Sequence, residues 1–209
     1  MENSEMAEQS VQGRGFAVHR LAARAKDDAL IGGIAGLVAD AVGRREALGL
    51  LGPLASSDYR KWLDELLADA VHGNAGLVAA ADTDGTVLGT GQWVRSPYAT
   101  RRVLAEVDRV VVAPAARGRG IGRAVVEAIV ADAAEQGIEV LFLEVRGNNH
   151  GGIALYESCG FVRTGVLPNA VADGRARHDV VLMCLELPRP DGVLLHGSDP
   201  VGAGASEAR

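Results

Sequence analysis

The spacing of apolar residues changes from helical to strand-like near residue 77. Residues 30–41 and 59–70 carry apolar side chains at intervals of three and four, which predicts two amphipathic helices. Two short apolar runs follow, at Leu77–Ala81 and Thr86–Val94, and they flank Asp82-Thr83-Asp84-Gly85, a sequence typical of a hairpin turn. The first half of the chain therefore predicts a pair of helices followed by an antiparallel meander.

Strands and helices alternate in the second half. Leu104–Val112 and Val140–Val145 are typical of buried strands, and Ile121–Gln136 between them has one apolar face and ends before Gly137. A meander followed by this strand–helix–strand crossover predicts an α/β fold, a mixed sheet of six or seven strands with about four helices. The remaining elements that we expect are strands at Phe16–Leu21, Phe161–Val166 and Val180–Leu187 and a short helix at Gly152–Ser158.

The length and composition suit one domain with tails. The chain has 209 residues, and 48% of them are apolar, enough for a sizeable core. Residues 1–14 are polar, and residues 188–209 are rich in proline and glycine without periodicity. We therefore expect a folded domain at 15–187 between flexible tails at 1–14 and 188–209.

Charge and residue spacing argue against several classes of function. The net charge of −6 disfavours a general nucleic-acid binder, and the longest apolar run, Ala29–Ala39, is too short for a membrane span of about 20 residues. Cys159 and Cys184 form no disulfide framework, and the five histidines have no metal-ligand spacing. We expect a cytoplasmic protein without nucleic acid, membrane or metal partners.

An anion-binding turn is predicted where the strand at 104–112 ends. The sequence Arg117-Gly118-Arg119-Gly120-Ile121-Gly122-Arg123 leads into the next helix, whose first N–H groups are unpaired and lie at the positive end of the helix dipole. Glycines let a ligand approach the backbone closely, so the segment suits a pyrophosphate. Arg123 replaces the last glycine of a dinucleotide fingerprint, and the Gly-Lys-Ser/Thr of a P-loop is missing, so neither of those sites fits.

These residues, with Val112-Ala113-Pro114 before them, resemble the acetyl-CoA signature of the GNAT family of N-acetyltransferases. A second block, Asn149–Phe161, is similar to that family's N-x-x-A-x-A-L-Y-x-x-x-G-F, although Gly152 stands where the family often has alanine. The resemblance extends over 15–187 and is strongest at 104–166. It implies the GNAT fold, with acetyl-CoA bound where the strands at 104–112 and 140–145 separate.

The resemblance also assigns roles in cofactor binding. The backbone of Val110, Val111 and Val112 is expected to pair with the pantetheine arm, and Asn149 to meet the pantetheine or phosphate side. The pyrophosphate is expected to lie on Arg117, Gly118, Arg119, Gly120, Ile121, Gly122 and Arg123.

Acetyl transfer to an amine requires a base and an acid. An amine with a pKa of about 10.4 costs roughly 4.6 kcal/mol to deprotonate at neutral pH, and a carboxylate can accept its proton. The candidates are Glu106, Glu144 and, less favoured, Asp108. By the resemblance, Tyr156 lies beside the thioester sulfur and acts as the acid.

The acceptor stays open between two subfamilies. Leu143-Glu144-Val145-Arg146 and the residues after it resemble ribosomal-protein alanine acetyltransferases, but the Tyr-Tyr pair of those enzymes is missing. Glu106-Val107 and the residues after Phe161 resemble tabtoxin-resistance-type acetyltransferases, which favours a small amino-acid-like or antibiotic-like amine. A loop at Pro168–Asp179 is expected to help form the acceptor pocket.

Two further expectations follow from the family pattern. A non-catalytic CoA-binding module is the third interpretation, and it is disfavoured because it would not need Glu106, Glu144 and Tyr156 together. Dimers are common among similar proteins, so a homodimer is also expected by resemblance.

Overall fold

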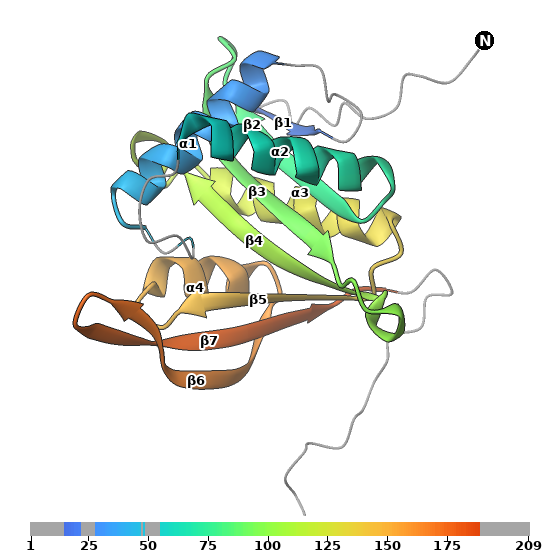
Figure 1. Cartoon of the computed structure of the whole chain (residues 1–209), viewed down its shortest axis with the longest axis vertical. Coiled ribbons are helices and arrows are strands. Elements are labelled where there is room, and N and C mark those ends of the chain that lie inside the picture. Colours follow the sequence, from blue (N-terminus) through green and yellow to red (C-terminus); the bar gives the residue numbers. More distant parts are fainter. Residues whose placement is uncertain (1–14, 22–27, 47, 49–54, 189–209) are drawn as a thin grey trace, which may run out of the picture.

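A computed structural model describes residues 15–21, 28–46, 48 and 55–188 of the chain. The predicted tail at 1–14 and, except for Pro188, the predicted tail at 188–209 lie outside these residues. Over the described part, the chain forms one seven-stranded mixed sheet with four α-helices, so the predicted fold class is confirmed (Figure 1). No helix of this part is long and apolar enough to cross a membrane.

The sheet is antiparallel except at its centre. Its strand order is β1-β2-β3-β4-β5-β7-β6, and only β4 and β5 run parallel. That parallel pair is connected through the crossover helix between the two strands. The strands are β1 (Ala17–Arg20), β2 (Ala75–Ala81), β3 (Val87–Arg95), β4 (Leu104–Val112), β5 (Val140–Arg146), β6 (Val162–Asp173) and β7 (Ala176–Glu186).

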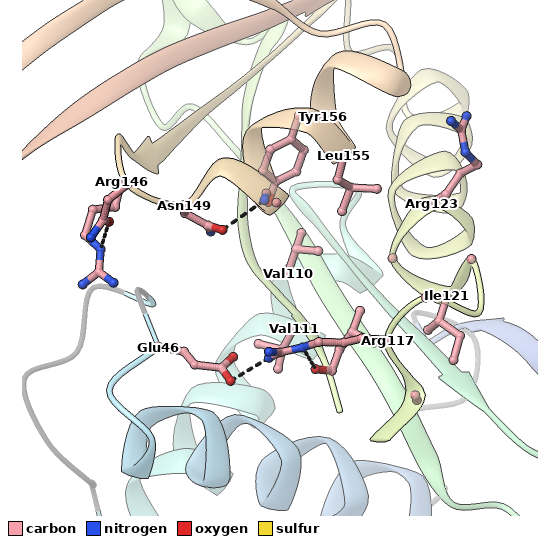
Figure 2. A pocket seen from close by; sticks show the side chains of 18 residues that line it. Glu46, Val110, Val111, Arg117, Ile121, Arg123, Arg146, Asn149, Leu155 and Tyr156 are labelled. Atoms are coloured by element: carbon pink, nitrogen blue, oxygen red, sulfur yellow. Dashed lines mark hydrogen bonds and ion pairs between the residues drawn. The ribbon is translucent and has the colours of Figure 1, made fainter. Parts of the chain in front are cut away.

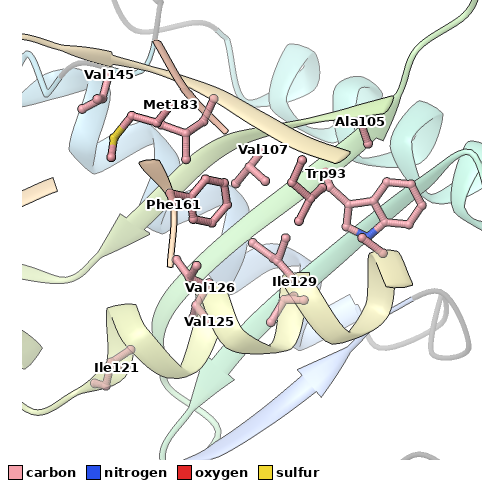
Figure 3. Packing of buried hydrophobic residues seen from close by; sticks show 14 of the residues in the cluster. Trp93, Ala105, Val107, Ile121, Val125, Val126, Ile129, Val145, Phe161 and Met183 are labelled. Atoms are coloured by element: carbon pink, nitrogen blue, oxygen red, sulfur yellow. The ribbon is translucent and has the colours of Figure 1, made fainter. Parts of the chain in front are cut away.

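Helices cover both faces of the sheet and create two apolar cores. One core joins the first two helices to the strands, and the other joins the sheet to the crossover helix, with Trp93, Ile129 and Phe161 among its members (Figure 3). All seven residues of β2 are buried, because both of its faces are covered. The helices are α1 (Asp28–Gly43), α2 (Ser56–Val71), α3 (Ile121–Glu135) and α4 (His150–Ser158).

A β-bulge in β4 changes which residues face each core. Gln92 lies opposite Asp108 and Thr90 lies opposite Val111, so β4 carries one extra residue, and Arg109 within it has a positive φ of 50°. Ala105 and Val107 pack in the core with α3, but after the bulge Val110 and Val112 do so. The bulge therefore turns Val110 and Val112 to the face opposite that of Glu106 and Asp108.

The sheet opens between β4 and β5. Their pairing runs from Leu104 opposite Val140 to Glu106 opposite Phe142, whereas β5 stays paired with β7 as far as Arg146. Beyond Glu106, β4 no longer pairs with β5. The predicted cofactor residues Val110, Val111 and Val112 lie on β4 beyond this point.

The prediction of a loop at Pro168–Asp179 is wrong, because β6 continues to Asp173 and β7 begins at Ala176. Pro168 is tolerated because β6 is an edge strand, paired only with β7. The register shifts between Leu167 and Val171, and Asn169 adopts a positive φ of 56° there. An edge position and an irregular pairing thus accommodate the residues whose proline and glycine signals predicted a loop.

Candidate active site

The glycine-rich turn leaves three backbone N–H groups outside the helix ladder. Gly118 and Gly120 have φ values of 78° and 82°, the left-handed conformation that glycine adopts most easily, and Gly120 is the N-cap of α3. The helix ladder begins where the N–H of Ala124 donates to the Gly120 carbonyl at 3.1 Å. The three preceding N–H groups therefore lie before the first helical bond, at the positive end of the helix dipole.

The three arginines of the turn have different surroundings. Arg117 forms an ion pair with Glu46 at 2.6 Å, and its Nε donates to the Val112 carbonyl at 3.2 Å. Arg123 forms an ion pair with Glu127 at 3.4 Å and donates to the carbonyl of Ser158 at 3.0 Å. Arg119 is exposed and makes no ion pair within the described part of the chain. One guanidinium of the three is thus without a carboxylate partner there.

A cavity of about 610 Å³ opens from this turn into the gap between β4 and β5 (Figure 2). The turn supplies its polar end, while Val110, Leu155 and Tyr156 give it apolar walls. This combination suits a ligand with an anionic group at one end and an apolar arm. The predicted cofactor residues that line it are Val110, Val111, Val112, Arg117, Gly118, Gly120, Ile121, Gly122, Arg123 and Asn149.

Asn149 begins α4 as well as lining this cavity. Its Oδ1 accepts a hydrogen bond from the Gly152 N–H at 3.0 Å, so the side chain is the N-cap of the helix (Figure 2). A Cβ on residue 152 would lie 2.6 Å from Asn149 Nδ2. Glycine at this position therefore lets Asn149 keep its capping conformation.

Tyr156 lies on α4, against the core that includes α3. Its ring packs edge-on against Phe161, with centroids 5.8 Å apart. Burial raises the pKa of Tyr156 above its ordinary value of 10.0, and the nearby charges of Asp108 and Cys159 raise it further. The phenol consequently keeps its proton at neutral pH and can donate a hydrogen bond into the first cavity.

The candidate bases lie in a second cavity of about 660 Å³. Glu106, Asp108 and Glu144 all line it. Burial raises the pKa of Glu106, the charges of Asp108 and Glu144 add to the rise, and Arg109 opposes it. Asp108 is held by its neighbour, with its Oδ2 2.7 Å from Arg109 Nη1. The structure therefore brings the three carboxylates together in one cavity and places Tyr156 in the other, close enough for the charge of Asp108 to act on it.

Sequence reasoning missed two residues that line both cavities, Glu46 and Arg146. Glu46 follows α1 and belongs to neither motif. It meets Arg117 only through the tertiary fold, because 71 positions separate them. Arg146 belongs to the Leu143–Arg146 block but had no predicted role, and its Nε donates to Asn148 Oδ1 at 2.7 Å. No sequence signal marked Glu46.

Comparisons with known proteins identify the family of this chain. The model of the acetyltransferase (GNAT) family matches residues 49–161, more than half of the chain. The chain belongs to this family. A structure of a GNAT phosphinothricin acetyltransferase from Sinorhizobium meliloti, in complex with AcCoA, covers 89% of the chain and 96% of its own, with a TM-score of 0.71 and 18% identity. At 18% identity, this structural similarity shows only that the two chains share a fold.

Two curated relatives match the GNAT chain over shorter stretches. The [ribosomal protein bS18]-alanine N-acetyltransferase of Escherichia coli K12 is 34% identical over 83 residues, 40% of this chain. The mycothiol acetyltransferase of Rhodococcus erythropolis is 36% identical over 104 residues, 48% of this chain. The chain spans 56% of the length of the first relative and 35% of the second.

Proposed function

We propose that residues 15–187 form an acetyltransferase unit that transfers the acetyl group of acetyl-CoA to a primary amine of a small molecule. The observation that carries this proposal is the opening between β4 and β5. On one side lies the cavity that contains the glycine-rich turn and Tyr156, and on the other lies the cavity that contains Glu106 and Glu144. A donor and an acceptor can thus approach the same point from two sides.

The first cavity has the chemistry that acetyl-CoA requires. Acetyl-CoA supplies the activated acetyl group as a thioester. The free N–H groups at the start of α3, with Arg117 and Arg123, suit its pyrophosphate. Arg119, which was also predicted to hold it, does not line this cavity. The backbone of Val110–Val112, which has no strand neighbour on the β5 side, suits the amide groups of the pantetheine arm. Asn149 would stand beside that arm.

The two cavities divide the proton transfers. Glu106 or Glu144 takes the proton of the amine, whose nitrogen then bonds to the acetyl carbon as the carbon–sulfur bond breaks. Tyr156 donates a hydrogen bond to the leaving sulfur. The phenol gives this proton to the sulfur and regains one from the nitrogen, which loses its second proton as it becomes an amide, so the products are the amide and the free thiol.

The walls of the second cavity favour a small acceptor over a protein N-terminus. Residues 170–174 of the β6–β7 hairpin and residues near the end of α1 face each other across it. Arg45 and Asp173, 3.8 Å apart, connect these two walls. The names of the relatives include both kinds of acceptor, an alanine of a ribosomal protein and phosphinothricin. An extended peptide would have to displace the Arg45–Asp173 contact.

Release of free thiol from acetyl-CoA tests the function directly. The protein is incubated with acetyl-CoA and, in turn, phosphinothricin, other small amino-acid-like amines and a peptide that begins with alanine. We expect amine-dependent thiol release, fastest with a small amine. Tight CoA binding without turnover of any amine would instead indicate a non-catalytic CoA-binding module, and faster turnover of the peptide would favour the protein N-terminus.

A further inference from the structure

Glu46 connects the two cavities through an ion pair that a bound cofactor would compete with. Its Oε1 lies 2.6 Å from Nη2 of Arg117, a residue of the glycine-rich turn, and accepts a second hydrogen bond from Arg44 Nε at 3.1 Å. The side chain is 27% exposed. The same carboxylate lines the cavity of the candidate bases. Glu46 therefore stands between the expected sites of the pyrophosphate and of the amine.

The backbone holds Glu46 in this place. The N–H of Glu46 donates to the Ala41 carbonyl at 3.0 Å, and the N–H of Arg45 donates to the Val42 carbonyl at 2.9 Å. Arg45 has a positive φ of 59°. These features form a Schellman motif at the end of α1, with arginine at the position where glycine is usual. Strained backbone of this kind persists where the surrounding structure fixes it, and it is frequent at functional sites.

A pyrophosphate on the turn would change the partner of Arg117. Guanidinium groups form strong paired hydrogen bonds with phosphate oxygens, and a doubly charged pyrophosphate attracts Arg117 more strongly than a single carboxylate does. It would also repel Glu46, which lines the same cavity. Cofactor binding therefore favours the arrangement in which Arg117 bonds to phosphate and Glu46 loses this partner.

Resting on the proposed function, we propose that Glu46 is an acceptor-binding residue that becomes available when the cofactor's pyrophosphate takes Arg117. Its carboxylate then attracts the ammonium form of the amine into the second cavity. The acceptor class follows from this chemistry: an amine that docks as a cation. Acceptor binding is consequently tighter after the pyrophosphate has bound, and acetyl-CoA binds first.

The test compares two donors, acetyl-CoA and S-acetylpantetheine, which lacks the pyrophosphate. The acceptor is whichever of phosphinothricin and the alanine-initiated peptide the wild-type protein acetylates. For wild type, we expect the amine KM to be lower with acetyl-CoA by about 5-fold or more, the usual lower size of coupling between two sites. The control Glu135→Gln, which breaks the remote ion pair with Arg20, should keep this ratio.

Two variants change the ratio from opposite directions. In Glu46→Gln, the amine KM should be high with both donors, because the attracting charge is absent. In Arg117→Gln, Glu46 keeps its contact with Arg44 but lacks Arg117 at all times, so the amine KM should be low with both donors. Each variant should bring the ratio of the two KM values close to one, whereas a loss of folding would lower kcat with both donors.

Two results would overturn the inference in distinguishable ways. A Glu46→Gln protein that keeps the wild-type ratio refutes the role of Glu46 while the proposed function stands. A wild-type protein that binds CoA but acetylates neither these two amines nor any other amine of the panel refutes the proposed function, and the inference with it.

Discussion

Tyr156 and Glu106 show how burial sets the protonation of the two proposed catalytic groups. Burial is the main reason that the pKa of each side chain is raised, and nearby acidic groups add to it. A phenol is already protonated at neutral pH, and for Tyr156 the shift extends the protonated range further above it. For Glu106 the shift moves the change from acid to carboxylate above the ordinary value of 4.5, toward the range in which bases work.

Replacing Tyr156 by phenylalanine should lower kcat by about 100-fold or more, the usual size of a lost acid–base contribution. The phenylalanine ring keeps the contact with Phe161, so the affinity for CoA should change little. Thiol release measures kcat, and calorimetric titration measures CoA binding. Equal losses in both would mean that Tyr156 packs rather than participates.

Glu106→Gln and Glu144→Gln, followed against pH, should identify the base. A base acts when deprotonated, so kcat/KM should rise as pH increases through its pKa, which for Glu106 lies above 4.5. The variant that removes the base should lose this rise and most of its rate. Glu65→Gln, on the exposed face of α2, is the control. If both variants keep the rise, neither carboxylate is the base.

At the scale of elements, the bulge in β4 and the glycine turn create the two-sided site. The extra residue at Arg109 turns Val110 and Val112 to the other face of the strand, so one strand serves both cavities. Arg109 is itself held in place, with its guanidinium 4.9 Å from the ring of Trp62 on α2. Gly118 and Gly120 then reverse the chain into α3.

Gly118→Ala should weaken CoA binding by about 10-fold, with a loss of stability of about 1–2 kcal/mol from a side chain in the left-handed conformation. Gly85→Ala is the matched control, since Gly85 has a φ of 87°, also has open space around its Cβ position, and lies in the β2–β3 hairpin. Chemical denaturation and CoA titration measure the two effects. Similar CoA affinities of the two variants would contradict a cofactor role for the turn.

At the scale of the molecule, the two helical layers bury the sheet, and one polar pair is buried with it. Trp93 Nε1 donates to Asp132 Oδ2 at 2.6 Å, between β3 and α3. Gly76 makes room for this pair, because a Cβ there would meet both of its atoms at 2.1 Å. Burial raises the pKa of Asp132 from 3.8, although the Trp93 hydrogen bond acts in the opposite direction.

Asp132→Asn should flatten the dependence of stability on pH. A carboxyl whose pKa is raised in the folded state stabilises the protein fully below the unfolded value of 3.8, and this contribution is lost as pH rises through the folded value. The amide oxygen can still accept a hydrogen bond from Trp93. The stability of the variant relative to that of the wild type should therefore be higher at pH 8 than at pH 4. Urea midpoints across this range, with Asp64→Asn on α2 as control, measure it. If the stability of the variant changed with pH as steeply as that of the wild type, Asp132 would be excluded as the source of the pH dependence.

The sequence by itself determined the order and type of most elements and predicted the glycine-rich turn as an anion-binding site. Apolar spacing records which face of each segment is buried, and the turn needs neighbouring residues only, so both can be read locally. The predicted strand at 104–112 and helix at 121–136 agree with β4 and α3 within one residue. The order of the two motifs along the chain was sufficient to indicate the family.

The tertiary structure decided what depends on residues far apart in the chain. The hairpin at Pro168 forms because its strand lies at the edge of the sheet, and the bulge at Arg109 appears only in the register with β3. The pairing of Arg117 with Glu46 joins residues 71 positions apart. Local patterns contain no information on such pairings, because the geometry that brings these residues together exists only in the folded sheet.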